Sequence, residues 1–321
     1  MSPFNKDSTA EEVTEGFSSQ IKDRIFVITG TSAGGIGAYI ATSLARHSPA
    51  QLVLVARTKS KVDPVMEEIS AIDPNVKVTF VPCELTDRDS VRNAAETIND
   101  DPTIPHIDVL INNAGMMMLP KYQLDKSGYE LQLSANHLGP FMLTNLLLPK
   151  IKASGPSGRV VNVSSSGHRV SPFRFEDWNF SDGATYDGWT AYGQSKTANN
   201  LFTTELARRG ITALAAHPGT IMVTGLGRYM DLDAEEHPFA MLDRVALRNT
   251  GRKFVMSPEK TLSQGAASIL SPALDPEFAK DSGAYFEDGQ LGEAYGYSQD
   301  EGEAKKLWAL SEELVGQKFP E

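Results

Sequence analysis

The 321-residue chain has one cysteine, Cys83, and no apolar run close to the roughly 18 residues that a membrane-spanning helix needs. A single cysteine cannot form an internal disulfide, so nothing in the sequence indicates secretion. Basic residues are outnumbered, with 30 Lys and Arg against 41 Asp and Glu and a formal net charge of −11. Nucleic-acid-binding proteins normally carry a basic face. These features predict a cytoplasmic protein with no nucleic-acid partner and no membrane span.

Residues 1–20 contain few apolar side chains and lack the basic-then-apolar order of a signal peptide. They are predicted to form a polar N-terminal tail. The chain has 40% hydrophobic and 22% charged residues, typical of globular proteins, and we expect one domain over residues 21–321. The charged stretch 225–255 follows the last long apolar run. A loop of that length in a compact domain is expected to act as a substrate lid.

Short β-branched runs alternate with longer amphipathic stretches. Most runs are almost continuously apolar, as strands buried on both faces of a parallel sheet are. They cover residues 24–29, 51–56, 76–81, 107–112, 159–164 and 211–216. Helices are expected over 36–47, 60–72, 90–99, 126–150, 190–209, from Ser257-Pro258 to about 270, and over 300–316. The alternation predicts an α/β fold: a doubly wound parallel sheet (Rossmann fold) of about seven strands with helices on both faces.

A glycine-rich turn, Thr29 to Gly37, follows the first apolar run and precedes the first helix. Glycine lets the main chain approach a pyrophosphate closely, and the N-terminus of the following helix attracts negative charge. An ordinary flexible turn is the alternative, but the place in the first βα unit favours dinucleotide binding. The residues expected to contact the cofactor here are Gly30, Thr31, Ser32, Gly35, Ile36 and Gly37.

The end of the second apolar run indicates which dinucleotide is bound. NAD-binding chains usually place an acid there for the ribose hydroxyls, whereas this chain has Arg57 within Ala-Arg-Thr-Lys-Ser-Lys. A guanidinium can bind a 2′-phosphate through paired, charge-assisted hydrogen bonds. A solvated basic helix start is the alternative. The sequence therefore favours NADP(H) over NAD(H).

Tyr192 and Lys196 lie four residues apart on a predicted helix, so that their side chains share one face. A free phenol has a pKa of about 10, which is too high for efficient acid–base catalysis at neutral pH. A cation within about 6 Å favours the phenolate and lowers that pKa. This spacing is common among surface pairs, so its weight depends on the neighbouring motifs.

Together these motifs resemble the short-chain dehydrogenase/reductase superfamily over about residues 24–316, with the retinol-dehydrogenase-like and protochlorophyllide-reductase-like branch most similar. The resemblance rests on the glycine turn and on motifs that follow in the family's order. These motifs are Asn112-Asn113-Ala114-Gly115, Asn136 in Ser-Ala-Asn-His-Leu-Gly-Pro, Ser164-Ser165, Tyr192 with Lys196, and His217-Pro218-Gly219.

The resemblance implies a catalytic role for four residues. Tyr192 would protonate the carbonyl oxygen during reduction, and Ser165 would donate a hydrogen bond to the same oxygen. Lys196 would hold the nicotinamide ribose and lower the phenol's pKa. Asn136 would hold a water that links Lys196 to bulk solvent.

The resemblance also implies further cofactor contacts. These come from Glu84, Leu85, Asn112, Ala114, Gly115, Tyr192, Lys196, Pro218, Gly219 and Thr224. The chain departs from the family in two places. Its glycine turn has one extra residue, and its threonine after Pro218-Gly219 comes one position late, so either Thr220 or Thr224 contacts the cofactor.

The six histidines show no metal-ligand spacing, so no metal is expected. The methionine run 116–118 either fills the core or forms the floor of an apolar substrate pocket. The aromatic residues of 173–189 either form the wall of that pocket or only fix the long loop on the sheet. The leading hypothesis is an NADPH-dependent carbonyl reductase or alcohol dehydrogenase acting on a ketone or aldehyde, bulky and apolar or aromatic. A catalytically silent dinucleotide-binding regulatory protein and a dehydratase or epimerase are the alternatives. The resemblance also favours a homodimer or homotetramer.

Overall fold

The computed structural model describes residues 3–230 and 237–320. One sheet has the strand order β3-β2-β1-β4-β5-β6-β7-β8, and every neighbouring pair is parallel except β7 with β8. The strands are β1 (Ile25–Thr29), β2 (Gln51–Ala56), β3 (Lys77–Pro82), β4 (Val109–Asn112), β5 (Arg159–Val163), β6 (Thr212–His217), β7 (Tyr285–Glu287) and β8 (Gln290–Leu291). This arrangement confirms the doubly wound α/β fold. The described residues form eight strands, against about seven expected, because β7 and β8 are too short to show a periodic pattern.

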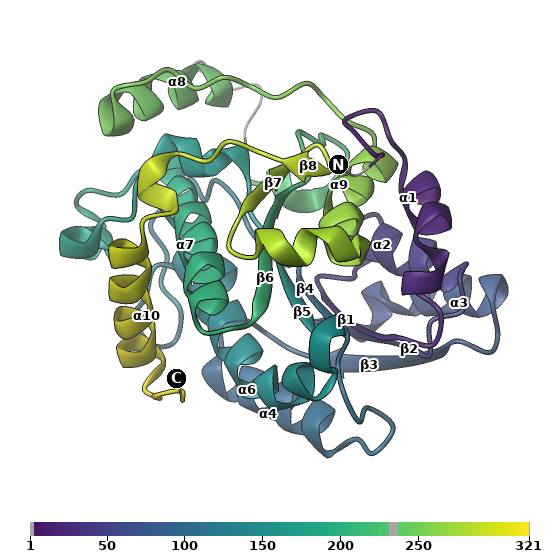
Figure 1. The fold of residues 1–321 in the computed structure, drawn as a ribbon. Helices are drawn as coiled ribbons and strands as arrows, with labels where there is room; N and C mark the ends of the chain where they lie inside the picture. Colours follow the sequence, from purple (N-terminus) through teal and green to yellow (C-terminus); the bar gives the residue numbers. More distant parts are fainter. Residues whose placement is uncertain (1–2, 231–236, 321) are drawn as a thin grey trace.

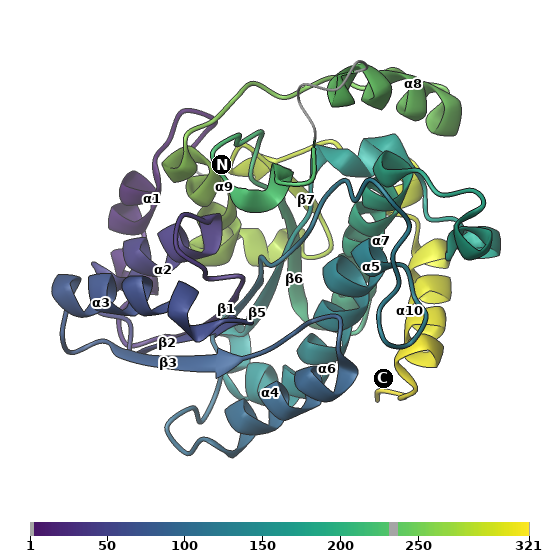
Figure 2. The ribbon, with the colours of Figure 1, turned by 180° about the vertical axis from the view of Figure 1, so that it is seen from behind.

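Helices cover both faces of the sheet (Figures 1 and 2). The pleat of β1 shows why both faces are apolar: Ile25 and Val27 enter one core cluster, and Phe26 and Ile28 enter the other. One face carries α1 (Ala10–Gly16), α2 (Ile36–Ala45), α3 (Asp63–Ile72) and α9 (Leu262–Leu274). The other carries α4 (Arg88–Asp100), α6 (Gly139–Ala153), α7 (Gly188–Arg208) and α10 (Glu301–Val315).

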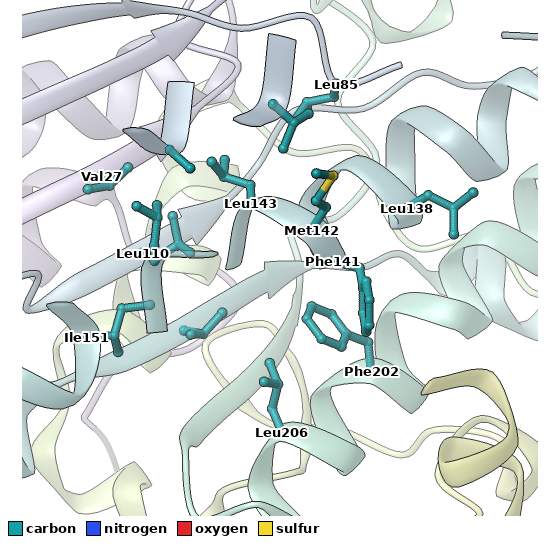
Figure 3. Close-up of a cluster of buried hydrophobic side chains, with 14 of the residues drawn as sticks. Val27, Leu85, Leu110, Leu138, Phe141, Met142, Leu143, Ile151, Phe202 and Leu206 are labelled. Carbon is teal, nitrogen blue, oxygen red and sulfur yellow. The ribbon is translucent and has the colours of Figure 1, made fainter. Parts of the chain in front are cut away.

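The face of the sheet that α4, α6, α7 and α10 cover holds a large part of the core (Figure 3). Phe141 of α6 and Phe202 of α7 meet with ring centroids 5.2 Å apart, and Trp308 of α10 lies 5.0 Å from the Phe141 ring. The C-terminal helix is therefore part of the domain core, packed on α6 and α7.

Residues 1–20 differ from the expected polar tail. Thr9 begins α1 with a capping box in which its side chain accepts from the Glu12 N–H and Glu12 caps Thr9 in return. The helix buries Ala10 and Val13, and the Ala10 N–H donates to Ser263 Oγ of α9 at 2.9 Å. Two small apolar residues one turn apart are enough to dock this short helix, which is too weak a pattern to detect in the sequence.

The segment after β6 also differs in part from expectation. The chain from Ser257 runs without a helix to Thr261, which caps α9 through a second capping box with Gln264. The helix therefore begins at Leu262 and not at Ser257-Pro258. Helix α8 (Pro238–Thr250) lies within the expected lid, whose residues 231–236 fall outside the described residues. The lid and the single-domain division stay predictions.

Candidate active site

A cavity of about 690 Å³ lies over the carboxyl ends of the strands, where the strand order reverses between β1 and β4. Gly30 begins the glycine turn with φ +75°, a conformation that favours glycine. A Cβ on Gly30 would lie 2.8 Å from Ala114 Cα, so only glycine lets the two loops meet. The extra residue of the turn is accommodated there, since the Ala33 N–H donates to Lys61 O at 2.9 Å.

The cavity brings together most of the residues predicted to bind a cofactor. Its walls include Gly30, Ser32, Gly35, Ile36, Arg57, Glu84, Leu85, Ala114, Gly115, Tyr192, Lys196, Pro218, Gly219 and Thr224. Thr224 lines this cavity. Thr220 lines only a second, smaller cavity next to it, and its hydroxyl donates to Ser257 O at 3.2 Å. Of the two threonines left open, the geometry favours Thr224.

Thr31, Gly37 and Asn112 do not line the cavity, and their predicted contacts with a cofactor stay predictions. Thr31 is fully buried, and a Cβ on Gly37 would lie 2.6 Å from Gly30 O. The Asn112 amide instead donates to Thr144 Oγ1 at 2.8 Å and Asn162 Oδ1 at 2.9 Å. Successive side chains of a strand point to opposite faces of the sheet. A motif that is matched to a family by sequence position does not show which face a given side chain is on.

Asn113, which belongs to the same Asn-Asn-Ala-Gly motif as Asn112, lines the cavity. Its amide donates to Thr29 O at 2.9 Å and to Gly30 O at 3.2 Å, so it ties the end of β4 to the glycine turn. The motif that was expected to contact the cofactor therefore also joins the end of β4 to the glycine turn.

Basic side chains gather at one end of the cavity. Arg57 and Lys61 line it, and Arg57 Nη1 lies 3.2 Å from Glu84 Oε2. Lys59 does not line it and pairs with Asp63. Lys61 was not among the predicted site residues, although it belongs to the same basic run. The positions of Arg57 and Lys61 suit a phosphate-bearing ligand.

Tyr192 and Lys196 face the same cavity from α7, with Lys196 Nζ 5.7 Å from the centroid of the Tyr192 ring. Both side chains are almost entirely buried. Burial raises the pKa of Tyr192 to about 12, while an interaction with Ser165 opposes the rise, and burial lowers the pKa of Lys196 to about 8. The expected lowering of the phenol's pKa by Lys196 is not seen, because loss of solvation is the largest influence on both groups.

Ser165 follows β5 and also reaches both Tyr192 and the cavity. Its Oγ accepts the Gly167 N–H at 3.0 Å, which leaves the hydroxyl proton available to another acceptor. A Cβ on Gly167 would lie 2.6 Å from Tyr192 Cε1. The turn that carries Ser165 is therefore in close contact with the phenol ring of Tyr192.

Asn136 lies behind the cavity wall, on the π-helical turn Ser134–Leu138 between α5 (Leu131–Leu133) and α6. Its amide donates to Met116 O and to Ser195 Oγ, each at 2.9 Å, and its Oδ1 accepts the Met116 N–H at 2.8 Å. π-Turns often occur at functional sites. Here the turn joins the loop after β4 to α7.

A second cavity, of about 300 Å³, shares Ser165, Tyr192 and Thr224 with the first. Its walls are mainly apolar and include Met117, Val170, Trp189, Leu242 and Phe254. Helix α8 covers it, and the Trp189 indole donates to Pro238 O at 2.9 Å. Of the aromatic residues over 173–189 only Trp189 lines this cavity, so the others serve mainly to pack the long loop.

Within residues 3–230 and 237–320 there is no group of three or more His, Cys, Asp and Glu side chains that could hold a metal. No helix over the same residues is long and apolar enough to cross a membrane. Cys83 is buried, and burial raises the pKa of its thiol to about 12, which makes it unreactive near neutral pH.

Comparison with known proteins identifies the family to which this fold and site belong. The model of the short chain dehydrogenase family matches residues 24–178. Mouse retinol dehydrogenase 12 is 36% identical over 302 residues, which cover 92% of this chain and 88% of that protein. The chain therefore belongs to the short-chain dehydrogenases, a family of oxidoreductases.

Its relatives define the branch more narrowly. Human retinol dehydrogenase 13 is 35% identical over 94% of this chain and 87% of its own length, and these similarities place the chain in the retinol-dehydrogenase-like branch. A crystal structure of an uncharacterised protein from Mycobacterium paratuberculosis superposes with a TM-score of 0.68 at 31% identity, covering 94% of this chain and 96% of that one. An NADPH-bound carbonyl reductase from chicken fatty liver shares the fold, with a TM-score of 0.59 at 21% identity over 85% of this chain and 100% of that one.

Proposed function

We propose that this protein is an NADPH-dependent carbonyl reductase, acting as an alcohol dehydrogenase in reverse, on a bulky apolar or aromatic ketone or aldehyde. The observation that carries the proposal is the junction of two cavities at Ser165 and Tyr192. One cavity is large and partly polar, and Arg57 and Lys61 are among the residues that line it. The other is smaller, mainly apolar and enclosed by α8. A dinucleotide in the first and a carbonyl compound in the second would meet at these two hydroxyl groups.

The bound nicotinamide would supply the hydride. Tyr192, whose pKa of about 12 keeps it protonated at neutral pH, would donate a proton to the carbonyl oxygen. Ser165 would donate a hydrogen bond to the same oxygen and stabilise the charge that develops there. Lys196 would hold the ribose hydroxyls beside the phenol, and its present bond to Val163 O at 2.9 Å aims the ammonium along the cavity wall.

The proposal is tested by mixing the protein with NADPH and a panel of aromatic and long-chain aldehydes and ketones. We expect NADPH consumption matched by an equal amount of alcohol, measured by mass spectrometry. NADPH binding without turnover of any carbonyl would contradict the proposal and favour a silent binding protein. Conversion of a substrate with no net redox change would instead favour a dehydratase or epimerase.

Replacing Arg57 by Ser is expected to weaken NADPH binding by roughly 10–100-fold, because a hydrogen bond to a charged group contributes about 1.5–3 kcal/mol. Binding of NADH, which lacks the 2′-phosphate, should change by less than about threefold, as fluorescence titration can measure. The matched control is Lys59→Ser, which removes a cation from the same run without touching the cavity. Equal weakening for both dinucleotides would refute the preference for NADP(H).

The pH profile of reduction is expected to fall on its basic side. Burial lowers the pKa of Lys196 from 10.5 to about 8, so the ammonium is charged below that pH and loses its proton above it. If the charged form holds the ribose, kcat/KM should fall about tenfold per pH unit well above pH 8. Measuring kcat/KM from about pH 6 to 10 checks this, and a profile that stays level throughout would be incompatible with the role of Lys196.

Location and assembly stay predictions. The acidic composition and the single cysteine favour the cytoplasm, and the family resemblance favours a homodimer or homotetramer. Size-exclusion chromatography with light scattering measures the assembly directly.

A further inference from the structure

His168 is a buried histidine three residues after Ser165, in the 3₁₀ turn Ser166–Val170. Its Nδ1 lies 2.6 Å from Ser165 O, and its Nε2 lies 3.3 Å from the main-chain N of Tyr295. The carbonyl can only accept and the amide can only donate. The ring must therefore carry its proton on Nδ1 and leave Nε2 free to accept.

The ring is also held in the neutral state. Burial lowers the pKa of His168 to about 3, with Arg169 and His217 adding to the effect and the bond to Ser165 and the charge of Glu287 opposing it. A protonated ring would present a second N–H to the Tyr295 amide, which cannot accept it. The imidazole therefore acts as a fixed connector and not as a proton carrier.

His168 joins three parts of the molecule. Its carbonyl accepts from Tyr297 OH at 2.7 Å. Thr197, next to Lys196 on α7, places its Oγ1 3.2 Å from the same carbonyl and 2.7 Å from Ser171 O, so its one proton is shared between the two. Its ring packs edge-on against Tyr285 of β7, with centroids 4.8 Å apart. The residue thus ties the turn after β5 to the catalytic helix and to the segment that precedes α10.

The turn that His168 holds has little room to move. Ser165 is extended, with φ −164° and ψ 155°, and Gly167 is so close to the Tyr192 ring that a Cβ would clash with it. A rotation of the Ser165 peptide would move Oγ relative to the phenol. Displacements of about 1 Å at a reacting centre can cost about 10²-fold in rate.

We propose that His168 is a positioning residue, which sets the Ser165 hydroxyl against the Tyr192 phenol through its Nδ1–H bond to the Ser165 carbonyl. This inference rests on the proposed reductase function, in which Ser165 binds the substrate oxygen. The Tyr295 amide anchors the far side of the ring, so the C-terminal part of the chain contributes to the geometry of the catalytic serine.

Two substitutions separate the two hydrogen bonds of the ring. In His168→Asn the amide nitrogen can reach the position of Nδ1 and keep the bond to Ser165. In His168→Gln the longer amide can reach the position of Nε2 and keep only the bond to Tyr295. We expect kcat to stay within about threefold in His168→Asn and to fall by roughly 10–100-fold in His168→Gln, with NADPH dissociation constants unchanged in both. Equal kcat losses, or no loss in either variant, would overturn the proposal.

A measurement on the unaltered protein covers the case in which both variants fail to fold. Nitrogen-15 NMR of the histidine rings should show His168 protonated on Nδ1 and unprotonated on Nε2 between about pH 5 and 8. The opposite tautomer, or a charged ring, would overturn the inference. If the unaltered protein reduces no carbonyl, the proposed function fails. The NMR result still tests, independently of activity, whether the His168 ring donates to Ser165 and accepts from Tyr295.

Discussion

Replacing Tyr192 by Phe is expected to lower kcat/KM for carbonyl reduction by about 10²–10⁴-fold, the range that general acid catalysis contributes. The phenol is the group at the junction of both cavities that burial keeps protonated, with a pKa of about 12. Phenylalanine keeps the ring and its packing against Trp189, 6.3 Å away between centroids, and removes only the hydroxyl. NADPH binding should therefore change by less than about threefold. Steady-state kinetics and fluorescence titration measure the two effects.

Tyr122→Phe provides the matched control. Tyr122 lies outside both cavities and donates its hydroxyl to Asn179 O at 2.9 Å, so its loss removes one hydrogen bond of about 0.5–1.5 kcal/mol from the fold. Reduction should proceed at the unaltered rate. Undiminished turnover in Tyr192→Phe would remove Tyr192 as the proton donor, whatever the control shows.

Replacing Phe141 by Ala is expected to lower the free energy of unfolding by about 3–5 kcal/mol. Phe141 is fully buried, and its ring contacts those of Phe202, Trp308 and Phe319. These contacts join α6, α7 and the C-terminal segment, as the cluster in Figure 3 shows for Phe141 and Phe202. Removing the ring leaves a cavity between three helices, which rigid helices cannot fill by relaxing.

Chemical denaturation followed by circular dichroism measures the loss. Leu291→Ala is the control, because Leu291 is 55% exposed and a surface substitution usually changes stability by less than about 0.5 kcal/mol. A loss below about 1.5 kcal/mol in Phe141→Ala would mean that the C-terminal helix does not depend on this cluster.

The main architecture was predictable because its signals are local. Apolar runs without polar alternation are typical of strands covered on both faces. All six predicted runs are strands of the sheet, although β3 at its edge is only partly buried. The glycine turn was predicted from its place after the first strand, whereas Ser165 and Thr224 were predicted from the family resemblance; all three line the cavity over the strand ends. Helix α1 and strands β7 and β8 were missed because seven, three and two residues are too few to establish a period.

The sequence alone determined which elements form, in what order, and which reactive side chains follow each strand. Only the tertiary structure decided which way those side chains face and how strongly they hold a proton. Asn113 lines the cavity, whereas the buried Asn112 side chain bonds Thr144 and Asn162. Burial shifts the pKa values of Tyr192 and Lys196. The partner of His168 is the amide of Tyr295, 127 residues further along the chain. Local sequence patterns do not reveal such distant contacts, because these contacts form only when the helices and strands pack together.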